Sequence, residues 1–155
     1  MPYKKSLKRF SNRSWEEFSD EVHRARNEHL MDGIVAGCAL VAYADGWVTD
    51  EERVRMLGLI RGFEPIAVFG LGEVETTFES LTDRFAANQH EGERTALDAV
   101  ARVKGAGRYP ALLVETCCAI ADADGGFDAE ERAAAIRICE VLALDPQMFG
   151  LAEAP

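Results

Sequence analysis

Apolar residues recur at spacings of three and four along most of this chain of 155 residues, and no segment alternates convincingly between apolar and polar residues. The first spacing marks one face of an α-helix, whereas a half-buried strand has a period of two. Glycine and proline interrupt the pattern between segments. The sequence therefore predicts a compact all-α globule of about seven helices. These cover residues 14–29, 31–44, 49–63, 73–87, 92–104, 109–123 and 128–143, and a short turn from Asp145 places Met148, Phe149 and Leu151 against the body.

One acidic helix–turn–helix segment occurs twice. Adding 79 to the residue number superposes Asp45-Gly46 on Asp124-Gly125, Glu51-Glu52-Arg53 on Glu130-Glu131-Arg132, and Cys38 on Cys117. We call residues 43–53 the first elbow and residues 122–132 the second elbow. Two copies are too few for a solenoid, so this internal repeat predicts a globule of pseudo-twofold character.

Helix capping accounts for part of the acidity of the elbows. Thr49 with Glu52, and Asp128 with Glu131, have the spacing of a capping box, in which the glutamate reaches back to the N-cap amide. Acids in a first helical turn also suit the positive end of the helix dipole. The glycine after each preceding helix is suited to a left-handed C-terminal cap. A purely structural interpretation therefore covers the acids that follow each turn.

The acids before each turn, Asp45, Asp122 and Asp124, are not explained in this way. At a helix C-terminus each should cost about 0.3–1 kcal/mol, since the dipole there is negative. A bound cation would offset this cost, and an all-oxygen donor set suits Ca²⁺ or Mg²⁺ rather than zinc or copper. The sequence therefore suggests a divalent-cation site, against the alternative of a plain solvated acidic surface. The candidate ligands are Asp45, Glu52, Asp122, Asp124, Asp128 and Glu131.

The second elbow is not an EF-hand. Numbered from Asp122, the loop has Phe127 where an EF-hand requires glycine and Ala133 where it requires glutamate. The first elbow has fewer acids, because Tyr43 stands where Asp122 stands. Either each elbow binds a cation alone, with the first weaker, or one site draws on both.

Charge and composition limit the cellular location and the kinds of partner that we expect for this protein. The net charge is −10, yet residues 1–13 carry +5, which leaves −15 on the remainder. We interpret residues 1–13 as a basic N-terminal arm and 14–155 as one helical domain. The acidic body argues against nucleic acid as a partner. No apolar run approaches the ~20 residues of a membrane span, and no signal-peptide pattern is present, so we expect a cytoplasmic protein.

The four cysteines form no CxxC pair and are interpreted as buried reduced thiols, with a soft-metal or redox role for Cys117-Cys118 as the alternative.

The doubled DG-x5-E elbow in an all-helical chain resembles the TerB family of tellurite-resistance proteins. The resemblance rests on two segments, NEHLMDGIVAGCALVAYADGWVTDEERVRMLGLIR and IADADGGFDAEERAAAIRICEVLALDPQMFGL, and extends from about Ser14 to Leu151. It implies a compact all-α fold of about seven helices with an internal repeat. It also implies an acidic metal-binding patch at the elbows, where Asp45, Glu52, Asp124 and Glu131 match, and a stress-response role beside TerC and calcium-binding TerD-type proteins.

We therefore predict a non-enzymatic binding or scaffold module that binds a hard divalent cation and docks protein partners of a stress-response complex at the cytoplasmic face of the membrane. A metal-dependent hydrolase is one alternative, although no nucleophile motif, phosphate-binding glycine loop or histidine cluster supports it. A metal-free interaction protein is the other, with Trp47 and Phe127 either exposed or buried in the turns. Arg53 and Arg132 are interpreted as partners of nearby acids, or as contacts for an anion such as tellurite.

Overall fold

The computed structural model describes residues 28–46, 48–62 and 70–152. Within these ranges it contains six α-helices, one short 3-10 helix and no strand, so the predicted all-α fold is confirmed. The predicted helix at 14–29 and the basic arm at 1–13 lie outside the described residues. The elements are α3 (Glu28–Ala42), α4 (Asp50–Gly62), α6 (Leu71–Ala87), α7 (Gln89–Ala101), α8 (Tyr109–Ala123), α9 (Ala129–Val141) and η1 (Pro146–Phe149).

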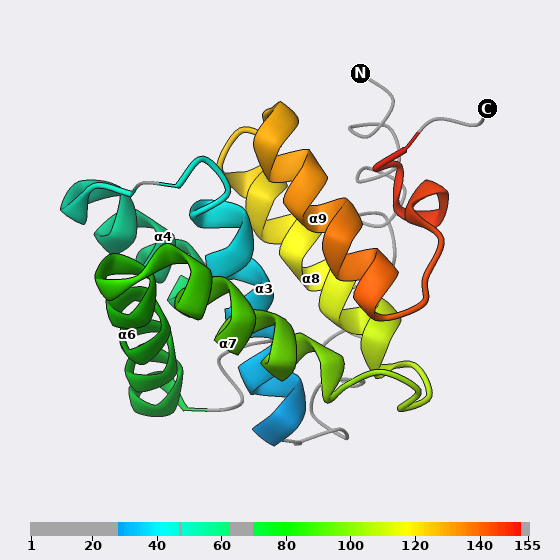
Figure 1. Cartoon of the computed structure of the whole chain (residues 1–155), viewed down its shortest axis with the longest axis horizontal. Helices are drawn as coiled ribbons and strands as arrows, with labels where there is room; N and C mark the ends of the chain where they lie inside the picture. The colour runs from blue at the N-terminus through cyan, green and yellow to red at the C-terminus, as the bar shows by residue number, and fades with distance from the viewer. Residues whose placement is uncertain (1–27, 47, 63–69, 153–155) are drawn as a thin grey trace.

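Helix α3 is the centre of the described fold. It packs against α6 and α7 on one side and against α8 and α9 on the other (Figure 1). Residues 33–41 are all buried, which is the pattern of a helix surrounded by protein rather than one with a single apolar face. Small residues allow the close packing, since a Cβ atom added at Gly37 would lie 2.7 Å from the Cys117 Sγ atom.

The internal repeat is visible as two helix pairs, α3–α4 and α8–α9. Cys38 and Cys117, which are equivalent in the repeat, are buried next to each other, close enough for the Cys38 thiol to raise the pKa of Cys117. Contact between equivalent positions is what a twofold or pseudo-twofold axis produces. The elbows that follow α3 and α8 lie at the same end of the molecule (Figure 1).

The break between α6 and α7 is a single residue, Asn88. Its backbone N–H caps α6 by donating to the Arg84 carbonyl oxygen, and its side chain caps α7 by accepting from the Glu91 N–H at 3.1 Å. Helix α7 therefore begins at Gln89, one turn before the predicted start at residue 92. At the other end of the described chain, Phe149 and Leu151 are buried as predicted, but Met148 is 59% exposed, so its predicted packing against the body is wrong.

Substitution of two helical glycines tests this packing. A Cβ atom at Gly92 would lie 2.7 Å from the Phe85 Cα atom, and backbone cannot give way cheaply, whereas a Cβ atom at Gly58 in α4 would meet nothing within 4 Å. We expect Gly92→Ala to destabilise the fold by about 1–3 kcal/mol through overpacking. Gly58→Ala should stabilise it by about 0.5–1 kcal/mol, because only the helix-propensity term remains. Urea unfolding of both variants measures the difference, and equal effects would contradict the close approach of α6 and α7.

Candidate functional site

The second elbow is built from two local capping structures. After α8, the Gly126 N–H donates to the Ala121 carbonyl oxygen at 2.7 Å, and Gly125 has the left-handed φ of 101°. This is the Schellman arrangement, and it requires the glycine that the sequence provides. At the start of α9, Asp128 Oδ1 accepts from the Glu131 N–H at 2.7 Å, and Glu131 Oε1 accepts from the Asp128 N–H at 3.0 Å. The predicted capping box is confirmed.

Phe127 closes the second elbow from within. Its side chain is only 5% exposed and belongs to the core, so the interpretation of this aromatic residue as a buried plug is confirmed and an exposed apolar patch there is wrong. Trp47, its counterpart in that interpretation, lies outside the described residues. The turn is thereby fixed to its two helices on the apolar side, and the carboxylates remain on the outer side.

The first elbow is held differently. The Tyr43 ring is buried and stacks on Phe85 with a centroid separation of 4.6 Å, and the Tyr43 carbonyl oxygen accepts from Gln89 Nε2 at 3.0 Å. Burial raises the pKa of the Tyr43 hydroxyl; the Arg53 charge opposes the shift, and Asp83 and Asp50 add to it. Thr49 caps α4, accepting from the Glu52 N–H at 3.0 Å. Tyr43 therefore contacts α6 and α7 at the repeat position where the second elbow has the exposed carboxylate of Asp122.

Asp45 was predicted to lie in the last turn of its helix, but α3 ends at Ala42 and Asp45 is an exposed residue of the turn. Asp122 does lie in the last turn of α8, and Asp124 is its C-cap residue. The unfavourable placement against the helix dipole therefore holds most directly for the second elbow.

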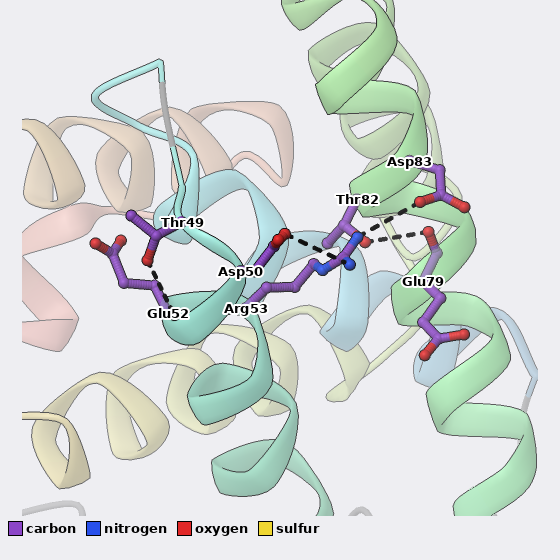
Figure 2. Close-up of polar contacts among 7 residues, drawn as sticks. All are labelled: Thr49, Asp50, Glu52, Arg53, Glu79, Thr82 and Asp83. Carbon is purple, nitrogen blue, oxygen red and sulfur yellow. Dashed lines mark hydrogen bonds and ion pairs between the residues drawn. The ribbon is translucent and has the colours of Figure 1, made fainter.

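Arg53 joins α4 to α6. Figure 2 shows its guanidinium between two carboxylates, with Asp50 Oδ1 at 3.8 Å and Asp83 Oδ1 at 3.5 Å. In the same view Thr82 Oγ1 donates to the Glu79 carbonyl oxygen at 3.1 Å within α6. The interpretation of Arg53 as a partner of nearby acids is confirmed.

Arg55 connects the two elbows, and the sequence analysis did not identify it. Its Nε atom lies 3.3 Å from Asp124 Oδ1, so a side chain from the helix of the first elbow neutralises the C-cap carboxylate of the second. The pair is separated by 69 positions, and the repeat-equivalent residue is Ala134, so neither periodicity nor the repeat indicates this contact. The structure thus supplies one internal cation where a bound ion was suggested.

The six candidate ligands are only partly brought together. Asp128 and Glu131 are hydrogen-bonded to each other's backbone. Burial raises the pKa of the Glu131 carboxyl, and the charges of Asp128 and Asp124 add to the shift while the backbone hydrogen bond from Asp128 opposes it. Asp45, Glu52 and Asp122 are exposed. In the part of the chain that the structure describes, no three His, Cys, Asp or Glu side chains are arranged as metal ligands. The carboxylate oxygens suit a hard cation by their chemistry, but they do not form a preassembled site.

All four cysteines are buried free thiols. The neighbouring Cys38 thiol and then burial raise the pKa of Cys117, and burial raises the pKa of Cys118; both pKa values lie well above the ordinary thiol value. Burial also raises the pKa of Cys139 to about 12. Since the thiolate is the reactive form, these residues are packed core thiols, as predicted.

The site and fold together define a class: an all-helical domain in which two acidic helix–turn–helix elbows meet at one end of a central helix. The chain belongs to the TerB family, described as tellurite resistance protein TerB, which it matches over residues 31–154. It is similar to the tellurium resistance protein TerB of Alcaligenes sp., with 39% identity over 70 residues, which span 45% of this chain and 57% of that relative. No solved structure matches the chain. Among the described helices, none has both the length and the apolar character needed to cross a membrane.

The raised pKa of Glu131 predicts a pH-dependent effect of Glu131→Gln. Glutamine can keep the capping hydrogen bond but carries no charge. The folded carboxyl binds its proton more tightly than the unfolded one, so ionised Glu131 costs stability above its folded pKa, and this cost disappears as the pH falls toward the unfolded value of 4.5. In EDTA the variant should be more stable than wild type at pH 7 and equal to it below pH 4.5. Urea midpoints across this range measure the effect, with exposed Glu130→Gln as control; a constant difference would contradict it.

The thiols provide a second prediction. With their pKa values raised, Cys117, Cys118 and Cys139 should not react with 5,5′-dithiobis(2-nitrobenzoate) at pH 7 in the native protein, and all four thiols should react after unfolding in guanidinium. Absorbance of the released thionitrobenzoate counts the reactive thiols. Rapid reaction of a native thiol, at a rate above that of global unfolding, would show that the core is accessible and would revive a redox role.

Proposed function

We propose that this TerB-family protein is a cation-responsive binding module of a tellurite-resistance system. Ca²⁺ or Mg²⁺ would bind the carboxylates of the elbows, chiefly Asp122, Asp124, Asp128 and Glu131, and the ordered acidic face would dock a protein partner. The observation that carries the proposal is the surplus of carboxylates at the C-terminal end of α8, where Asp124 is paired with Arg55 and Asp122 is exposed. No catalytic step is assigned to the protein, and the cation would act as a structural and electrostatic ligand.

The Arg55–Asp124 pair is compatible with such a response. Its side chains are 65% and 24% exposed, and an ion pair of this kind contributes only about 0.2–1 kcal/mol. A divalent cation carries twice the charge of the guanidinium and can therefore compete for Asp124 at little cost. The first elbow would contribute Asp45 and Glu52 only if one site draws on both elbows.

The wider role is part of the same proposal. The family name and the name of the Alcaligenes relative refer to tellurite or tellurium resistance. We propose that the module acts as a scaffold in a stress-response complex, in the cytoplasm at the inner face of the membrane. The negative charge of the elbows would exclude nucleic acid and favour partners with a basic surface.

Thermal unfolding tests cation binding. If the dissociation constant is near 50 μM, about 5 mM CaCl₂ or MgCl₂ should stabilise the folded state by about 2.7 kcal/mol relative to EDTA at matched ionic strength. For a chain of this size that shift corresponds to about 5–10 °C in Tm. Asp124→Asn with Glu131→Gln should abolish the shift, and in EDTA this double variant should be at least as stable as wild type, because Glu131→Gln removes the cost of the ionised carboxylate.

Arg55→Gln provides the sharper variant, because it removes the internal competitor. We expect it to increase the cation-induced shift in Tm, whereas Arg61→Gln, which breaks the ion pair with Glu75 elsewhere on α4, should leave the shift unchanged. If neither ion shifts the midpoint of wild type or of Arg55→Gln, the elbows are helix caps alone and the proposal is wrong.

A further inference from the structure

A small groove lies beside the first elbow, between α3, α7 and α9. Its volume is about 190 Å³, below the ~300 Å³ at which pockets for drug-sized ligands begin, so it suits a single side chain. The groove is open because alanines stand where larger residues would fill the space. It is lined by Leu40, Ala44, Leu97, Ala133 and Ala134, with Glu93, Glu130 and Arg137 as its charged members.

Of the two carboxylates that line the groove, one is paired with a neighbouring cation and the other is not. Glu93 is engaged by Arg137, with Oε2 and Nη1 3.6 Å apart, and by Gln89 Nε2, which donates to Oε1 at 3.3 Å. Glu130 is exposed and forms no hydrogen bond or ion pair with any side chain in the described part of the structure. The apolar part of the groove therefore lies next to one carboxylate, Glu130, that no described side chain neutralises.

The internal repeat indicates what the groove lacks. In the first copy, Arg55 extends from α4 to Asp124 at the end of α8. The equivalent of Arg55 on α9 is Ala134, which lines the groove together with Ala44, the residue before the equivalent carboxylate Asp45. The groove thus occupies the place where a counterpart of the Arg55 side chain would lie. The position that arginine has on α4 is therefore occupied by alanine on α9.

We propose that this groove binds an arginine side chain presented by a basic, partly apolar segment of a partner protein. The aliphatic stem would lie against Leu40, Leu97 and Ala134, and the guanidinium would meet Glu130; long basic side chains divide in this way between apolar surface and charge. The net charge of −10 favours the approach of a basic segment. This inference goes beyond cation binding, because it needs no metal.

The test uses the full chain, ¹⁵N-labelled, in EDTA. The probe is the peptide acetyl-Ala-Leu-Arg-Leu-Ala-amide, and its matched control replaces arginine with citrulline, which keeps the shape and removes the charge. Chemical-shift changes should centre on Leu97, Ala133, Ala134 and Arg137. The citrulline peptide should bind about two- to five-fold more weakly, as expected for loss of a partly exposed ion pair.

Two variants localise the contact. Glu130→Lys should weaken binding of the arginine peptide, whereas Glu51→Lys, the repeat-equivalent change in the first turn of α4, alters the net charge equally and should not. Ala133→Leu should fill the groove and weaken both peptides; Ala133 is exposed, so the fold should tolerate it, and thermal unfolding confirms this for each variant.

Equal binding of the two peptides, shifts outside the groove, or an equal effect of Glu51→Lys would overturn the proposal. So would sedimentation that shows dimers of wild type but monomers of Ala133→Leu, because a second copy of the chain would then occupy the groove. Because every titration is done in EDTA, a failure here does not affect the calcium and magnesium test, and absence of cation binding does not affect this one.

Discussion

Burial of α3 on all sides determines where the other described helices can lie. Residues 33–41 are buried without interruption, so α6, α7, α8 and α9 must each present an apolar face to the same helix. Glycine at positions 33 and 37 makes this possible by allowing Leu113 and Cys117 to approach closely. The Cys38 and Cys117 thiols, which are equivalent in the repeat, lie next to each other within this arrangement. The two elbows lie at one end of the molecule (Figure 1).

The acidity of that end has two physical origins. The acids that open α4 and α9 stabilise helix starts, and the Asp128–Glu131 capping box does so with two reciprocal hydrogen bonds. Asp122 and Asp124 do the opposite, since they sit where the α8 dipole is negative. The ion pair between Arg55 and Asp124 offsets part of this cost, but it lies at the surface and contributes little to stability. Such a weak internal pair is what an exchangeable external cation can replace.

The two copies of the elbow have diverged in the residues that face their neighbours. Tyr43 of the first copy packs on Phe85, whereas its equivalent in the second copy, Asp122, is exposed. Arg55 of the first copy contacts Asp124 of the second elbow, whereas its equivalent, Ala134, lines a groove. The capping residues, by contrast, serve the same purpose in both copies. A repeat that keeps its turn chemistry and varies its outer side chains can give one fold two distinct surfaces.

The sequence by itself determined the features that depend on residues a few positions apart. Helical periodicity, the capping box, the left-handed Gly125 and the repeat are local, so the helix pattern and the turn chemistry could be predicted, and the start of α7 was missed only because Asn88 caps it. Only the tertiary structure decided that α3 is central, that Arg53 meets Asp83 and Arg55 meets Asp124, and that α7 and α9 leave a groove. The physical reason is that an amphipathic pattern shows which face of a helix is buried but not which distant side chain lies opposite it; for the same reason the ligand set of the elbows stays a prediction.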